Sequence, residues 1–340
     1  MILKQDGSVW NCGLNSNGQL GTDVMMHSST TFETAVSSGA IAIAAGGSHS
    51  LILRQDYGVL SAGLEVGRPS SQLNAFTIVG VIDLGKAVAA GVGHSLVLTK
   101  RGAVWAKGWN KYGQLGDGTY TDKAIFVMVI PRGAAAMAAG QVHSIVMMTD
   151  GSVWATGWNQ SGQLGDGLMR TVNSRSNFVQ VMSSGAKAVA AGASHSIVLK
   201  QDSSVWATGW NMYGQLGDGT TADTDVYHLV FNYAKAIAAG TRHTIVLKLD
   251  GSVWTTGYNR YGQLGDFSGS QREIFFPVIS SGAKAVAAGG FHSMVLKDDG
   301  TLWTAGCNQY GQLGNAGAYV MAVNTFVRVA DIDEGGCTKG

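Results

Sequence analysis

Short apolar runs alternate with glycine-rich turns along the whole chain, and no run shows the spacing of an amphipathic helix. In one stretch, four such runs follow one another: "AKAVAAG" (186–192), "SIVLK" (196–200), "SVWATGW" (204–210) and "HLVFNY" (228–233). Their lengths and the turns between them are typical of strands. The pattern therefore predicts a chain built from short strands, four to a unit.

This unit repeats along the sequence. One slot holds Trp in six copies and Leu in the second, and its members are Trp10, Leu60, Trp105, Trp154, Trp206, Trp254 and Trp303. They are 50, 45, 49, 52, 48 and 49 residues apart. Four strands in each repeat of this length match a propeller blade. We therefore predict an all-β fold, a seven-bladed β-propeller of four-stranded blades, with residues 1–340 forming a single domain.

The chain begins inside a unit, since "ILKQDGSVW" (2–10) aligns with "VLKQDSSVW" (198–206) and the strand before it is missing. We expect the tail, residues 330–340, to pair beside residues 2–4, so that strands from both termini close the ring. Deleting this tail should then lower the melting temperature. The second copy also departs from the pattern, and we expect a short or distorted turn in that blade.

Composition limits the function classes. Lys plus Arg number 23 and Asp plus Glu 22, so no global positive field would attract nucleic acid or an anionic membrane. No apolar run is long enough to span a bilayer. The three cysteines lack C-x-x-C spacing, which predicts neither a disulfide framework nor a zinc site. We expect a monomer in the cytoplasm or the nucleus.

Two phrases make the repeat recognisable: "AAGxxHS", and "DGxVWxxGxNxxGQLGDG" followed by an outer strand. Together they resemble the repeat family named after the regulator of chromosome condensation, and the resemblance covers essentially the whole chain. Its implied fold is the same seven-bladed propeller. The second copy is degenerate, because Leu60 and Glu65 replace the Trp and Asn of the phrase and "GQLG" is absent.

The residues that invite a chemical interpretation recur once per blade. A ring spreads equivalent slots around its circumference, so they would not converge on one metal ion or one substrate. We interpret both the repeated tryptophans and the histidines of "AAGxxHS" as structural, the latter being His49, His94, His143, His195, His243 and His292. No catalytic or phosphate-binding motif is present. The sequence therefore predicts a protein that is not an enzyme and has no cofactor or metal.

Function is then expected from a surface. The resemblance implies binding to a protein, because family members include an exchange factor for a small nuclear GTPase, targeting domains of ubiquitin ligases, a plant ultraviolet-B photoreceptor and a bacterial β-lactamase inhibitor. Our leading hypothesis is a non-catalytic interaction module or scaffold. The alternative is a guanine-nucleotide exchange factor for a small GTPase, although the repeat intervals leave no room for the extra wedge of such factors. Photoreception is disfavoured, because "GTRHT" (240–244) has Thr241 where the photoreceptor has Trp.

Two variable pairs of positions should lie on one face of the ring, namely the "xx" of "AAGxxHS" and the pair before "GQLG". They offer aromatic and basic residues, the types enriched at interface hot spots. The predicted partner-binding residues are Lys111, Tyr112, Tyr213, Arg242, Arg260, Tyr261 and Phe291. The turn alone would also explain the recurrence of tyrosine there.

Overall fold

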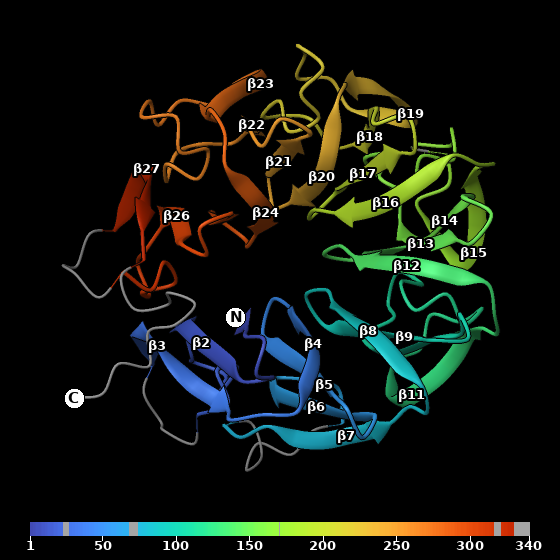
Figure 1. Ribbon diagram of the computed structural model, residues 1–340. Helices are drawn as coiled ribbons and strands as arrows, with labels where there is room; N and C mark the ends of the chain where they lie inside the picture. The colour runs from blue at the N-terminus through green and yellow to red at the C-terminus, as the bar shows by residue number, and fades with distance from the viewer. Residues whose placement is uncertain (23–26, 68–73, 170, 316–320, 330–340) are drawn as a thin grey trace.

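The computed structural model describes residues 1–22, 27–67, 74–169, 171–315 and 321–329. Their strands form seven antiparallel sheets arranged around a centre, like the blades of a propeller (Figure 1). Six sheets have four strands each, and the first has three in the described part of the chain. The prediction of an all-β, seven-bladed propeller is confirmed.

In six blades the strands follow one another from the innermost to the outer one, and in the first blade the described strands correspond to the second, third and outer ones. The first blade consists of β1 (Ile2–Leu3), β2 (Val9–Leu14) and β3 (Ser28–Val36). The other six, in order, are β4 (Ala40–Ala45), β5 (His49–Arg54), β6 (Gly58–Gly63) and β7 (Thr77–Val81); β8 (Gly85–Ala90), β9 (His94–Thr99), β10 (Val104–Gly108) and β11 (Lys123–Ile130); β12 (Ala134–Ala139), β13 (His143–Met148), β14 (Val153–Trp158) and β15 (Ser174–Met182); β16 (Ala186–Ala191), β17 (His195–Lys200), β18 (Val205–Gly209) and β19 (Thr224–Phe231); β20 (Ala234–Ala239), β21 (His243–Lys248), β22 (Val253–Gly257) and β23 (Arg272–Ile279); and β24 (Ala283–Ala288), β25 (His292–Lys297), β26 (Leu302–Cys307) and β27 (Ala322–Arg328).

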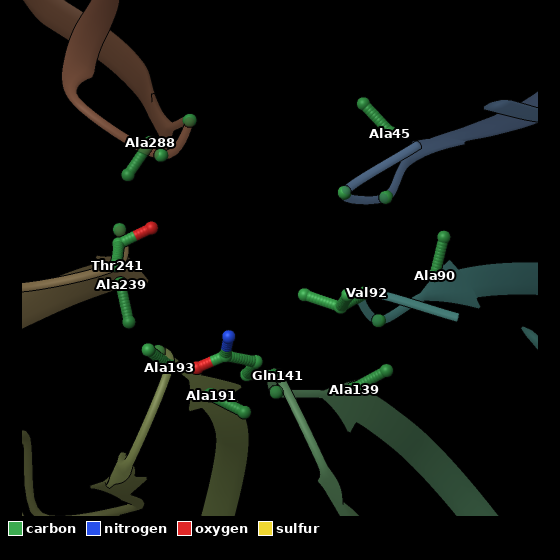
Figure 2. Close-up of a pocket in the computed structure, with 18 residues that line it drawn as sticks. Ala45, Ala90, Val92, Ala139, Gln141, Ala191, Ala193, Ala239, Thr241 and Ala288 are labelled. Carbon is green, nitrogen blue, oxygen red and sulfur yellow. The ribbon is translucent and has the colours of Figure 1, made fainter. Parts of the chain in front are cut away.

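Small residues line the centre of the ring. The inner strands β4, β8, β12, β16, β20 and β24 contact their neighbours in succession. At one end they enclose a channel lined mainly by Ala and Gly, with Val92, Gln141 and Thr241 as its larger members (Figure 2). Side chains with so few polar groups offer little to hold a ligand. A binding function is therefore expected on the faces of the ring.

The apolar core lies between neighbouring blades. For example, Leu199 and Val205 of the fifth blade pack in one cluster with Val246 of the sixth, and all three are at most 1% exposed. Because each blade buries its faces against two others, no blade has a complete core of its own.

Each "GQLG" turn fastens its own blade to the next one. Gly113 and Gly116, in the turn between β10 and β11, have positive φ, and their backbone lies against the outer strand of the following blade. A Cβ on Gly116 would lie 2.3 Å from the Phe178 ring. Thr156 Oγ1 of the next blade donates a hydrogen bond to the Gly113 carbonyl at 2.9 Å. The recurrence of this phrase thus has a physical cause, since it forms both a tight turn and a contact between blades.

The same contact joins the last blade to the first. The backbone of Gly311 lies against Thr30, and that of Gly314 lies against the Phe32 ring. Cys12 Sγ also lies 3.6 Å from the Gln312 carbonyl oxygen. The described residues of the last and first blades are therefore in direct contact. The predicted closing strand, residues 330–340, lies outside the described residues, as does part of the degenerate turn, residues 68–73.

Candidate protein-binding surface

Two sets of loops emerge on one side of the ring: those between inner and second strands, and those between third and outer strands. We call this side the turn face. The conserved framework of each turn is built by Asn and Gln side chains. Asn211 Oδ1 accepts the Leu216 backbone N–H at 2.9 Å, and Gln215 Oε1 accepts the Tyr213 N–H at 3.0 Å. The framework fixes the backbone and leaves the ring of Tyr213 on the surface.

The turn does not need tyrosine at this slot. Ser161 occupies it in the fourth blade and Asn17 in the first, and both make the same backbone hydrogen bond to a Gln side chain, at 3.1 and 2.8 Å. Since the bond comes from the main chain, the aromatic ring adds nothing to it. Turn geometry therefore leaves the recurrent tyrosines unexplained.

Aromatic rings of the fifth, sixth and seventh blades gather around one arginine. The Arg242 guanidinium lies 5.3 Å from the ring centroids of Trp210 and Tyr213 and 5.7 Å from that of Tyr258. Its Nη1 also donates to the Tyr213 hydroxyl at 3.4 Å. A cation within about 6 Å of a ring is attracted by the negative face of that ring. We call these four residues, together with Tyr261 and Phe291, the arginine cluster.

The remaining members extend the cluster towards the seventh blade. Tyr261 and Phe291 make an edge contact with centroids 5.4 Å apart, and Tyr258 contacts both at 6.2 and 6.3 Å. All are half-buried. Among the described residues no carboxylate forms an ion pair with Arg242. The guanidinium is thus held in place by rings and keeps its charge uncompensated.

The predicted residues divide into two groups. Tyr213, Arg242, Tyr261 and Phe291 lie in the arginine cluster, and Arg260 is exposed in the adjacent turn. Lys111 and Tyr112 belong to a separate group in an earlier blade. There, Tyr112 stacks on Trp158 with centroids 5.4 Å apart, and the Lys111 Nζ lies 5.8 Å from the Tyr112 ring.

Sequence reasoning missed Trp158, Trp210 and Tyr258. They occupy the slot just before the Asn of each turn, which also holds Leu64, Trp109 and Cys307. The third-strand Trp recurs in six copies, whereas this second aromatic position changes from copy to copy. The sequence indicates this position because mostly large apolar residues alternate there from copy to copy, next to a turn that recurs.

The repeated histidines form a ladder between blades. In five of the six, Nε2 lies 2.9 to 3.1 Å from a Ser or Thr hydroxyl of the next blade, the pairs being His49–Ser95, His94–Ser144, His143–Ser196, His195–Thr244 and His243–Ser293. In four of these pairs the hydroxyl donates its proton to a Gln carbonyl, as Ser144 does to Gln114 at 2.7 Å. The histidine must therefore be the donor, with its proton on Nε2.

Burial keeps these histidines neutral. It lowers the pKa of His94, His143 and His243 to about 3 and that of His195 and His292 to about 4. In His143, for instance, Nδ1 is buried without a hydrogen-bond partner and packs on Gly140. A second proton there would be a buried charge without an acceptor. The ladder thus joins neighbouring blades, and each of its histidines lies in a different blade. Among the described residues, no group of ligating side chains could hold a metal ion.

The repeated tryptophans are only half-buried. The indole N–H of Trp206 donates to Ser204 Oγ at 2.9 Å, and the Lys200 Nζ covers the ring at 3.7 Å from its centroid. Trp10, Trp254 and Trp303 are covered in the same way, by Lys4, Lys248 and Lys297. The rings nevertheless pack between blades, as Trp254 does against the cluster of the fifth and sixth blades, where its ring centroid lies 5.5 Å from that of Phe231.

These features define the class of protein: a seven-bladed β-propeller whose blades are fastened by "GQLG" turns and a histidine ladder. A family model described as the RCC1-like domain matches residues 69–337, and one for the regulator of chromosome condensation (RCC1) repeat matches residues 6–53. The chain belongs to this RCC1-like family.

Relatives agree with this assignment. The ultraviolet-B receptor UVR8 of Arabidopsis thaliana is 30% identical over 235 residues, which make up 66% of this chain and 42% of UVR8. The chain thus spans less than half the length of that curated relative. The structure of human WBSCR16 is similar with a TM-score of 0.83 and 20% identity, covering 95% of this chain and 94% of that one. The structure of Prp20p from Saccharomyces cerevisiae, a protein described with binding properties to Gsp1p and histones, is similar with a TM-score of 0.80 and 21% identity, covering 99% of this chain and 88% of that one. These structural likenesses concern the fold. In the part of the chain that the structure describes, no helix could cross a membrane.

Proposed function

We propose that this chain is a protein-interaction module that binds its partner through the turn face, with the arginine cluster at the centre of the contact. The observation that carries this proposal is the uncompensated Arg242 guanidinium, which three aromatic rings surround. Trp, Tyr and Arg are the residues that most often dominate interface energies. The rings also fix the Arg242 side chain before binding, which lowers the entropy cost of ordering it in a complex.

The charge of this face favours an acidic partner surface. Lys111 and Arg260 are exposed on it together with half-buried Arg242, and none of the three belongs to an ion pair found in the described residues. In contrast, acidic groups of the turns form ion pairs. Asp166 pairs with Arg175 at 2.9 Å, and Asp266 pairs with Arg272 at 2.7 Å.

The test compares two charge reversals of equal size. The variant Arg242→Glu/Arg260→Glu changes the turn face, and the control Arg101→Glu/Arg132→Glu changes exposed arginines in loops of the opposite face. Immobilised wild-type and variant chains are compared by quantitative mass spectrometry of the proteins that they retain. We expect a set of proteins that the control keeps and the turn-face variant loses, with both variants folded at the temperature of the assay. If both variants retain the same proteins, the surface is assigned wrongly.

Guanine-nucleotide exchange is a narrower form of the same activity. A nucleotide-release assay with the small nuclear GTPase separates the two, because a scaffold leaves the release rate unchanged. If the chain stimulates nucleotide release and Arg242→Glu/Arg260→Glu abolishes this stimulation, the chain is an exchange factor that uses the same surface.

A further inference from the structure

In the inner strands of the second to seventh blades, a β-bulge takes one residue out of the ladder near the face opposite the turn face, and in four of these blades that residue is an exposed lysine. In β16, pairing with β17 shifts between Ala186 and Ala188, so that Lys187 has no partner in the ladder and is exposed. The shift recurs in β20 and β24 at Lys235 and Lys284. A bulge redirects a side chain away from the regular alternation of the strand. Three consecutive inner strands thus carry an exposed lysine at the same place.

These three lysines, which we call the lysine arc, occupy the same place in three consecutive inner strands. Their strands β16, β20 and β24 are neighbours, with Cα atoms of adjacent strands within 8 Å. In the ring, β20 lies between β16 and β24 (Figure 1). A fourth lysine, Lys86, holds the same slot in β8, but its Nζ lies 3.4 Å from the Ala135 carbonyl oxygen of the next blade. The arc is therefore confined to the fifth, sixth and seventh blades.

The charge of the arc is not balanced by neighbouring acids. No ion pair found among the described residues includes Lys187, Lys235 or Lys284. The aspartates of the same face, at the turns between second and third strands, are engaged with their own turns. Asp202 accepts the Ser204 N–H at 2.9 Å, and Asp250 accepts that of Ser252 at 2.9 Å and pairs with Lys248 at 3.3 Å.

The pKa shifts of the aspartates on this face indicate which lysines lie near them. The pKa of Asp202 is lowered first by hydrogen bonds from Ser204 and then by Lys200, and that of Asp299 is lowered first by Thr301 and then by Lys297 and Arg328. The lysines at the ends of the second strands therefore offset these carboxylates, and the lysine arc does not.

We propose that the lysine arc binds a compact polyanion, a small molecule that carries several phosphate groups. Three adjacent ammonium groups suit such a ligand, because Lys binds phosphate as a point charge. Exposed hydroxyls of Ser183, Ser184, Ser280 and Ser281 stand just before two of the lysines in the repeated phrase "SSGAK" and can donate hydrogen bonds to phosphate oxygens. An extended polyanion fits less well, since it would leave the arc and cross the aspartate-bearing turns of the same blades.

Isothermal titration calorimetry tests the proposal with inositol hexakisphosphate as the probe, at about 0.15 M salt so that long-range charge effects are screened. The variant Lys187→Gln/Lys235→Gln/Lys284→Gln removes the arc. The control Lys100→Gln/Arg101→Gln/Arg132→Gln removes the same charge from exposed positions of the same face. We expect wild type to bind, the arc variant to bind at least about tenfold more weakly, and the control to stay within about twofold of wild type.

Several outcomes would overturn the proposal. One is that wild type does not bind the probe, and another is that the two variants lose equal affinity. A third is that duplex DNA or polyglutamate binds more tightly than the probe and that the arc variant loses this binding. The last result would mean that the arc recognises a macromolecule. Equal melting temperatures of the three proteins without probe ensure that the comparison concerns folded chains. Because the arc and the arginine cluster lie on opposite faces, failure of one proposal leaves the other intact.

Discussion

Lys107 and Glu65 form an ion pair between the third and second blades, with 3.2 Å between Nζ and Oε2 and both side chains at most 4% exposed. Glu65 stands where other blades have the Asn of the turn, and Lys107 stands where the fourth to sixth blades have a Thr that bonds the turn. Glu65 Oε1 also accepts the Ser95 hydroxyl at 3.1 Å. The two substitutions therefore compensate each other, since the pair takes the place of the missing "GQLG" contact.

Removing one partner of this pair should be strongly destabilising. Glu65→Gln or Lys107→Met leaves an uncompensated buried charge, which costs about 3 to 5 kcal/mol. The double variant should lose clearly less than the sum of the single losses, because no charge is left buried. Urea denaturation of the four proteins measures this coupling. Additive losses would mean that the two residues act independently.

The contact between turn and neighbouring blade can be tested with two glycines. Gly116→Ala adds a methyl group against the Phe178 ring, whereas Gly185→Ala adds one where no atom lies within 4 Å, although φ is positive at both. Both variants bear the cost of a left-handed Ala, about 1 to 2 kcal/mol. Overpacking should cost Gly116→Ala about 1 to 3 kcal/mol more. Equal free energies of unfolding for the two variants would contradict the interblade role of the turn.

The degenerate blade is better packed at Leu60 than its sequence suggests. Leu60 is 7% exposed and clusters with Val9 and Ile52, while Trp154 is half-buried. Leu60→Ala should therefore cost about 2 to 5 kcal/mol. From the sequence alone, Trp154→Ala would be the larger loss; from the structure we expect Leu60→Ala to be at least as large. Thermal and urea unfolding of both variants decide the order, and a much smaller loss at Leu60 would restore the sequence-based expectation.

Acid should unfold the protein through its histidines. The folded pKa values of about 3 to 4 lie below the ordinary 6.5, so that the unfolded chain binds protons first as the pH falls. Stability from this source is fully present above pH 6.5 and is lost as the pH falls from there towards 4. Each histidine contributes about 1.4 kcal/mol per pH unit in that window.

The free energy of unfolding, measured in urea between pH 7.5 and 5, should therefore fall steeply below pH 6.5. In this range most carboxylates stay ionised, which isolates the histidine contribution. His143→Gln should reduce the slope by one proton, whatever its effect on stability at pH 7.5. A slope unchanged by this substitution would show that His143 is not held neutral.

The sequence predicted the blades because the repeated slots record local turns and strand pairing, which each copy specifies by itself. It predicted Arg242, Tyr213 and Phe291 on a common face for the same reason. It could not predict that Lys107 compensates Glu65, because these residues occupy different slots of different copies and only the packing of two blades brings them together. The lysine arc was also missed. A lysine within "AKAVAA" looks like one more position of a strand until the bulge shows that it leaves the ladder.

Every link of the histidine ladder points the same way round, from a ring in one blade to a hydroxyl in the following one. Such head-to-tail contacts have no internal stop and would add units indefinitely. In this chain the series of blades closes where the seventh blade contacts the first through the backbone of Gly311 and Gly314. Because each unit contacts the next one in the same way, a chain with one extra copy of the repeat would have to change every contact between blades or leave one pair of blades apart.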